Sequence, residues 1–111
     1  MTKQQLRVRL RERVRAGMAL LDFRKPGWRH KIDLEKLDLR SCQSCVLGEV
    51  YGDYCLGMST LFPHDENSTS SRSEVAQSLG FYLNNDRHYN DLTAVWRAEY
   101  RRGQQRALIG G

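Results

Sequence analysis

The segment Ser41–Leu61 reads SCQSCVLGEVYGDYCLGMSTL, and its apolar residues fall on nearly every side of a helical wheel. This pattern predicts a central, buried helix. Three glycines, at positions 48, 52 and 57, lower its helix propensity by roughly 1 kcal/mol each relative to alanine, so packing must compensate or the helix must bend. Small residues gather on one face, which lets another backbone approach closely, and the first helix of the chain is the candidate neighbour. This face comprises Cys45, Gly48, Gly52, Cys55 and Ser59.

An amphipathic helix is predicted before this segment, from residue 3 to residue 21, because apolar residues recur there at three- and four-residue spacing. At about 100° per residue, arginines fall along both borders of the apolar stripe. Cations therefore flank the packing face on two sides. The first border carries Arg7, Arg11 and Arg15, and the second carries Arg9 and Arg13.

Two further helices are predicted in the C-terminal half of the chain. Ser71 followed by Glu74 forms a capping box, which opens a helix through Leu79 that Gly80 ends. A last helix is expected to start after Asn85 or Asp86. Its outward face is expected to carry Arg97, Arg101 and Arg102.

The remaining segments complete a single domain over residues 1–111. A short helix is the preferred prediction for residues 32–39, residues 63–72 lack periodicity and are expected to form an exposed loop, and residues 104–111 are expected to form a frayed tail. The predicted fold class is therefore all-α, a small bundle of four to five helices around the central buried helix.

Length and composition narrow the protein class. The chain has 111 residues, of which 40% are hydrophobic and 28% charged, close to the average of soluble globular proteins. This excludes large enzyme scaffolds, disordered chains and fibrous repeats. No apolar run approaches the about 18–20 residues that span a bilayer, and the N-terminus has no apolar signal-peptide core. We therefore expect a cytoplasmic protein that makes no membrane contact.

The net charge of +5 is unevenly distributed. Residues 1–40 hold 12 basic and 5 acidic side chains, residues 41–96 hold 2 and 7, and residues 97–111 hold 4 and 1. Basic ends around an acidic middle indicate one of two arrangements. The termini form a surface that binds polyanions, or they fold back on the acidic middle and are partly neutralised by it.

Cys42 and Cys45 have the C-x-x-C spacing of a metal site, but they supply only two of the four ligands that structural zinc requires. Cys55 lies about 15 Å from Cys45 if both belong to one helix, which is too far to share an ion. His30 and His64 are therefore the candidate remaining ligands, unless two chains share the site. The alternative is that the cysteines are small core residues and that the protein has no cofactor.

The sequence predicts binding rather than catalysis. Its acids stand in no recognisable relation to a histidine or a nucleophilic serine, so we predict neither an enzyme nor a small-molecule substrate. The five arginines at positions 7 to 15 can neutralise several phosphates with little sequence preference, and the alternative is a solvated helix face. If the apolar stripe of that helix is not fully covered, the helix would bind a partner protein or a second copy of the chain.

Over about residues 16–102 the chain carries the motifs Ala19-Leu20-Leu21-Asp22, Pro26-Gly27-Trp28, Ile32-Asp33, Leu37-Asp38, Cys42 and Cys45 with Val46-Leu47-Gly48, Gly52-Asp53-Tyr54, Leu79-Gly80-Phe81, and Tyr89 through Trp96. In this combination it resembles a group of small proteins of actinobacterial phages, of the mycobacteriophage type, and of actinobacterial genomes. The resemblance implies a phage or mobile-element accessory protein in the cytoplasm of a bacterial host, and it assigns no activity to any residue. We therefore predict a non-catalytic accessory protein that binds another macromolecule, a host or phage protein. The alternative is sequence-tolerant binding of nucleic acid through the arginine-rich N-terminal helix.

Overall fold

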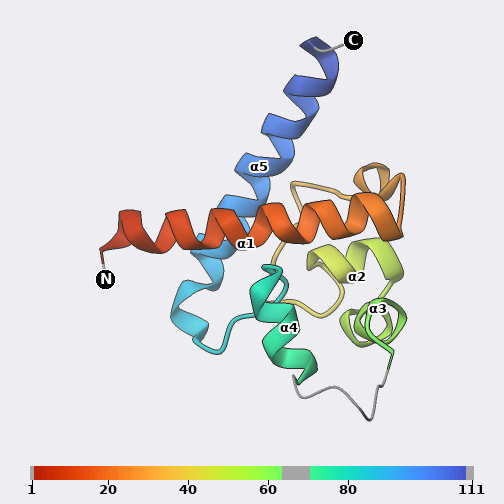
Figure 1. Ribbon diagram of the computed structural model, residues 1–111, viewed down its shortest axis with the longest axis horizontal. Coiled ribbons are helices and arrows are strands. Elements are labelled where there is room, and N and C mark those ends of the chain that lie inside the picture. Colours follow the sequence, from red (N-terminus) through yellow and green to blue (C-terminus); the bar gives the residue numbers. More distant parts are fainter. Residues whose placement is uncertain (1, 64–70, 110–111) are drawn as a thin grey trace.

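The computed structural model describes residues 2–63 and 71–109, and every regular element in this part of the chain is helical (Figure 1). The predicted all-α fold is confirmed. In chain order the elements are α1 (Lys3–Arg24), the 3₁₀ helix η1 (Trp28–Lys31), α2 (Val46–Tyr51), α3 (Tyr54–Leu61), α4 (Arg72–Ser78), the 3₁₀ helix η2 (Asp86–His88) and α5 (Tyr89–Ile109).

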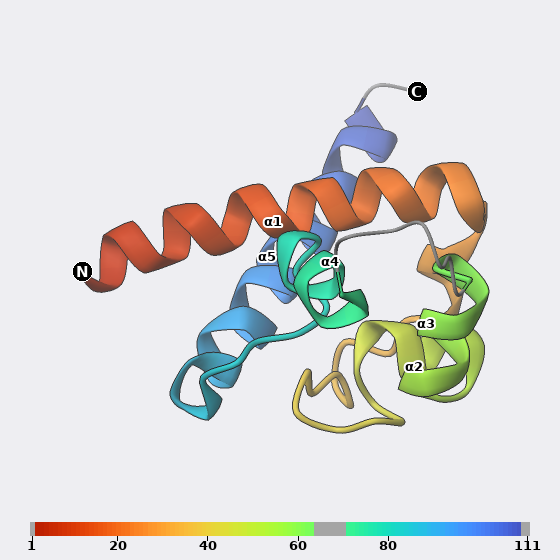
Figure 2. The same ribbon diagram turned by 60° about the horizontal axis from the view of Figure 1, so that its bottom comes forward.

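The two longest helices, α1 and α5, cross and pack against each other (Figure 1). Helices α2, α3 and α4 lie on one side of α1, and the C-terminal half of α5 projects beyond the opposite side (Figures 1 and 2). The first turns of α1 project away from the rest of the molecule as well. Both arginine-rich ends of the described chain therefore lie on exposed stretches of helix.

Helix α1 forms where the apolar spacing predicts it, and it continues one turn further, to Arg24. A capping box opens it, because the Thr2 side chain accepts from the Gln5 N–H while the Gln5 side chain accepts from the Thr2 N–H. The buried positions form the predicted stripe. They are Leu10, Val14, Gly17, Met18 and Leu21.

Helix α4 begins and ends at the predicted signals. The Ser71 hydroxyl accepts from the Glu74 N–H at 3.1 Å, and the chain leaves the helix through Gly80 at φ +74°. The C-terminal end of α4 lies directly against α1, because a Cβ built on Gly17 would overlap the carbonyl oxygen of Leu79. On the other side, Trp96 Nε1 of α5 donates to the Gly80 carbonyl at 2.7 Å. The turn after α4 is therefore held between the two crossing helices.

The predicted continuous helix over residues 41–61 is wrong, because the segment forms two helices, α2 and α3. Gly52 adopts φ +96°, a left-handed conformation that ends α2. Asp53 then caps α3, its carboxylate accepting from the N–H groups of Cys55 and Leu56. The neighbour expected for the small-residue face is also wrong. A Cβ on Gly48 would meet the backbone of Cys42 and Gln43, so the preceding loop, rather than α1, occupies that face.

Aromatic side chains fill the centre of the core. The Trp28 and Trp96 rings meet edge to face with centroids 6.3 Å apart, and Phe81 stacks on Trp96 at 5.8 Å. The indole N–H of Trp28 donates to Asp22 at 2.8 Å, which ties the loop after α1 to that helix. Buried side chains from α1, η1, the turn after α4 and α5 thus share one core.

Helix α5 also fixes the long connection between η1 and α2. Arg97 donates to the carbonyl oxygens of Leu34 and Leu37 at 3.0 and 2.9 Å, and the hydroxyl of Thr93 accepts from the Leu39 N–H at 3.0 Å. Residues 34–36 form a turn, so the short helix predicted over residues 32–39 is wrong. The outward placement expected for Arg97 is wrong too, because its guanidinium satisfies carbonyl groups that no helix or sheet serves.

The structure differs from the sequence prediction at the start of the C-terminal tail. Helix α5 extends to Ile109, so the frayed tail predicted from residue 104 begins too early; the Gln104 side-chain amide donates to the Tyr100 hydroxyl one turn earlier. In the loop predicted over residues 63–72, positions 64–70 lie outside the described residues, and Ser71 and Arg72 already belong to the start of α4. Among the described residues, none of the helices has the length and apolarity that a membrane crossing requires.

Candidate functional site

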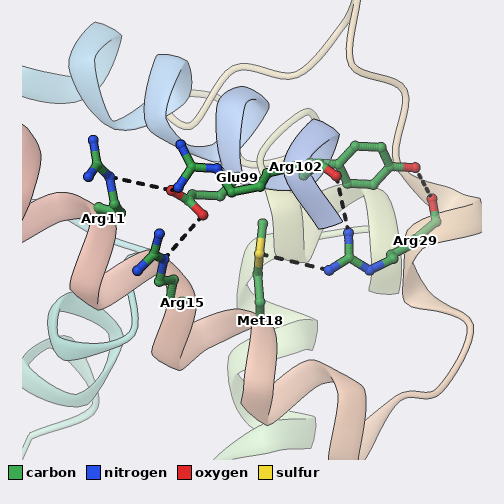
Figure 3. A network of polar contacts seen from close by, with 7 residues as sticks. Arg11, Arg15, Met18, Arg29, Glu99 and Arg102 are labelled. Atoms are coloured by element: carbon green, nitrogen blue, oxygen red, sulfur yellow. Dashed lines mark hydrogen bonds and ion pairs between the residues drawn. The ribbon is translucent and has the colours of Figure 1, made fainter. Parts of the chain in front are cut away.

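The arginines of α1 divide between two environments, as the helical spacing predicts. On the first border, Arg7 lies 3.8 Å from Asp91, while Arg11 and Arg15 lie 3.4 and 3.2 Å from the carboxylate of Glu99 (Figure 3). Both acids belong to α5. These three arginines therefore join the two crossing helices.

Glu99 is the centre of this contact. Its side chain is only 5% exposed, and a third cation, Arg102 of α5, lies 3.6 Å from the same carboxylate (Figure 3). A buried carboxylate needs such partners, because an unpaired charge in the interior is strongly unfavourable. The sequence does not predict that Glu99 pairs with arginines of α1, since Glu99 and Arg15 are 84 positions apart. The one available signal is that Glu99 is the single acid in a basic C-terminal stretch.

The cluster has more positive than negative charge. Four guanidinium groups face two carboxylates, and the arginine side chains of these pairs remain 44–51% exposed. The basic ends are therefore neutralised only in part, and mostly by Glu99 within the C-terminal stretch rather than by the acidic middle. Exposed guanidinium groups in excess over acids favour contact with anions.

Arg29 of η1 plays a structural role beside this cluster. Its guanidinium lies 4.7 Å from the Trp28 ring and 5.5 Å from the Tyr100 ring, and it donates to the Tyr100 carbonyl at 3.4 Å (Figure 3). The Tyr100 hydroxyl in turn donates to the Arg29 carbonyl at 2.7 Å. Gly103 leaves room for the guanidinium, since a Cβ there would lie 2.7 Å from it.

The second border of α1 faces a recess. Arg9 and Arg13 line an open cavity of about 230 Å³ between α1, α4 and the segment of residues 83–88. None of the ion pairs among the described residues includes either arginine. The structure thus separates the five predicted arginines into three that are paired with acids of α5 and two that line this recess.

The structure describes three of the four predicted zinc ligands. Cys42 and His30 are exposed, whereas Cys45 is buried at the start of α2, where its sulfur accepts from the Gly48 N–H at 3.2 Å. Burial raises the pKa of the Cys45 thiol to about 11, which opposes the thiolate form that zinc binds. His64 lies outside the described residues, and within them no three potential ligands gather around one point. The zinc site therefore stays a prediction.

Burial also raises the pKa values of three other titratable side chains, Glu49, Tyr51 and Tyr54. Burial raises the pKa of Tyr54 to about 12, and this tyrosine lines a small recess of about 170 Å³ with both cysteines of the C-x-x-C motif. Burial, with a smaller contribution from the charge of Asp33, raises the pKa of Glu49, whose Oε2 accepts from the Asp33 N–H at 2.9 Å. The Asp33 N–H satisfies one carboxylate oxygen of Glu49, whereas its Oε1 is buried and has no hydrogen-bond partner among the described residues.

Comparison of the chain with protein-family models, with curated proteins and with solved structures finds no match. The predicted relation to phage proteins therefore stays a prediction.

Proposed function

We propose that this protein is a non-catalytic nucleic-acid-binding protein that holds the phosphate backbone through the arginines of α1, with little dependence on base sequence. The observation that carries the proposal is the excess of half-exposed guanidinium groups over acids on this helix and at its crossing with α5. Such a surface suits phosphates, which arginine binds through paired N–H groups.

The arrangement of the arginines supports several simultaneous phosphate contacts. Arg9 and Arg13 are one turn apart, about 6 Å along the helix axis, and Arg7 and Arg11 follow the other border at the same spacing. The salt bridges to the buried carboxylate of Glu99 hold the guanidinium groups of Arg11 and Arg15 in place. Fixed side chains lose less conformational entropy when they bind than mobile ones.

A protein partner is the second candidate, and exposed apolar residues support it. The large hydrophobic side chains that stand exposed among the described residues are Val8, Phe23 and Leu56. Val8 and Phe23 are about 22 Å apart along α1, so they do not form one patch. Single exposed hydrophobic residues are common on soluble proteins, whereas binding surfaces are contiguous. The geometry therefore favours nucleic acid over a protein partner or self-association.

The test is fluorescence anisotropy of labelled duplex and single-stranded DNA, titrated with the protein across a salt series. The informative variant is Arg7→Gln/Arg9→Gln/Arg13→Gln. It leaves Arg11 and Arg15 in place, so that Glu99 keeps its partners and the fold is retained. The matched control is Lys31→Gln/Lys36→Gln/Arg72→Gln, which removes the same charge from exposed positions outside α1.

We expect the wild type to bind both probes with an affinity that falls steeply with salt concentration. The α1 variant should reduce the slope of log K against log salt by about 2–3, since each phosphate contact contributes about 0.9 on duplex DNA. The control variant should change the slope by less than about 1. Absence of binding at low salt, or an equal loss in both variants, would contradict the proposal.

A further inference from the structure

The recess beside Arg9 and Arg13 is lined by apolar, cationic and amide side chains and by His88, which lies 3.8 Å from Asp91. Leu6 provides the accessible apolar surface, because Leu10 and Leu83 also line the recess but are buried, and the two arginines stand at one edge. The opposite side carries side-chain amides, of Gln77 on α4 and of Asn84 and Asn85 in the following segment. The recess therefore offers apolar contact, positive charge and hydrogen-bonding groups within one small space.

The positive charge of the recess is not neutralised within the described chain. Arg9 and Arg13 take part in none of its ion pairs, in contrast to Arg7, Arg11 and Arg15 on the other border. Both belong to a long, capped helix and border the face of it that is packed in the core, so their positions relative to the recess are fixed by the fold. The charge indicates an anionic ligand.

The amides indicate which kind of anion. The side-chain amides of Gln77 and Asn84 make no hydrogen bond with other described residues, whereas Asn85 already accepts from the Arg87 N–H at 3.0 Å. A free amide presents a donor and an acceptor side by side, which matches the edge of a nucleobase, adenine above all. A bare phosphate or a carboxylate can accept from the amide N–H groups but has no donor for the amide oxygens, whereas a base edge uses both sides of the amide.

The size of the recess limits the ligand further. About 230 Å³ is less than the roughly 300–1,000 Å³ of clefts that enclose a whole small molecule. The recess is also open, so a longer chain can enter and leave it. One unit of a polymer fits these dimensions better than a free metabolite.

We propose that this recess binds one nucleotide unit of a single-stranded nucleic acid, an inference that rests on the proposed function and specifies it. Arg9 and Arg13 bind the phosphates on either side of that unit. The base lies against the apolar surface at Leu6, with its polar edge at Gln77 and Asn84. The arginines of the other border contact the backbone without reaching a base. Single strands are the preferred form, because only an unpaired base presents this edge freely.

The experiment measures the affinity of the full chain for two labelled probes of equal length and charge, an oligodeoxyadenylate and an abasic phosphodiester strand. The first variant, Gln77→Ala/Asn84→Ala, removes the amides without changing the charge. The second variant, Arg9→Gln/Arg13→Gln, removes the recess cations. Its matched control is Lys3→Gln/Arg7→Gln, which removes the same charge from residues of α1 that do not line the recess. Urea denaturation of each variant verifies that the fold is retained.

We expect the wild type to bind the adenylate strand at least about fivefold more tightly than the abasic strand. The amide variant should lose most of this preference, keeping only the part that comes from apolar contact with the base, and the Arg9/Arg13 variant should lose more affinity than its control. Three results would overturn the inference while leaving backbone binding intact. The wild type could bind the two strands with equal affinity, or the two charge variants could lose equal affinity. Polyglutamate could also displace the adenylate strand as effectively as an unlabelled adenylate strand does. If the wild type binds neither strand, the proposed function itself fails.

Discussion

The close approach of α1 to the end of α4 gives the most direct test of the fold, through the substitution Gly17→Ala. A Cβ at this position would overlap the carbonyl oxygen of Leu79, well inside the about 3.3 Å of an ordinary C···O contact. The obstacle is backbone, and it cannot turn aside, because Trp96 holds the Gly80 carbonyl at 2.7 Å on the far side. The two helices must therefore separate to admit one methyl group.

The expected magnitude follows from two opposing terms. Alanine in a helix interior is favoured over glycine by about 1 kcal/mol. Overpacking against a rigid neighbour costs about 3 kcal/mol or more, at the upper end of the usual range. The net loss is about 2 kcal/mol, which lowers the melting temperature of a domain of this size by about 10 °C.

Gly103→Ala is the matched control, because it places the same methyl group inside α5. There the Cβ would meet the end of the Arg29 side chain at 2.7 Å, and a guanidinium can shift. The helix-propensity gain of about 1 kcal/mol offsets the weakening of cation–π contacts worth about 0.5–1 kcal/mol, so stability should change little. Urea unfolding followed by the fluorescence of Trp28 and Trp96, both buried, measures the two variants. A Gly17→Ala protein as stable as the Gly103→Ala protein would refute the close approach of α1 and α4.

Two further predictions concern Glu99 and Cys45. Glu99→Gln should lower the free energy of unfolding by about 1–2 kcal/mol, which is less than for a fully buried pair because the arginines are half exposed. This loss should diminish in high salt, and urea titrations at two salt concentrations measure it. Cys45→Ser retains an N-cap acceptor for α2 but does not ionise near pH 10. Because the folded state raises the pKa of Cys45 from 9.0 to about 11, the unfolded state holds fewer protons in that interval, and wild-type stability falls as pH rises through it. The Cys45→Ser protein should gain about 2 kcal/mol relative to the wild type between pH 9 and pH 11, and a constant difference across that range would contradict the burial of the thiol.

Local signals in the sequence predict most of the helices. The apolar spacing of α1, the Ser71 cap and the Gly80 stop each act within a few residues, so one sequence suffices to identify them. The break between α2 and α3 was also encoded locally, since Gly52 followed by Asp53 is a helix stop followed by a helix start. The apolar character of the whole segment concealed it.

The contacts of the candidate site could be predicted only in part. Helical spacing correctly separates Arg9 and Arg13 from the other three arginines. It cannot predict that Glu99 receives Arg11 and Arg15, because that pairing depends on how α1 and α5 cross. The placement of Arg97 against the carbonyl groups of residues 34 and 37 depends on how the connection after η1 lies against α5.

The crossing of α1 and α5 has a consequence for biosynthesis. Arg15 and Glu99 are 84 positions apart, so α1 has to wait until these further residues have been synthesised before its partner helix appears. At about 5–20 residues per second this interval lasts several seconds. During that time the stripe of Leu10, Val14 and Leu21 is exposed to water on a nascent chain that cannot complete its core. The core should therefore form only after α5 has been synthesised, and folding should be slower than in helical bundles whose contacts join neighbours in sequence.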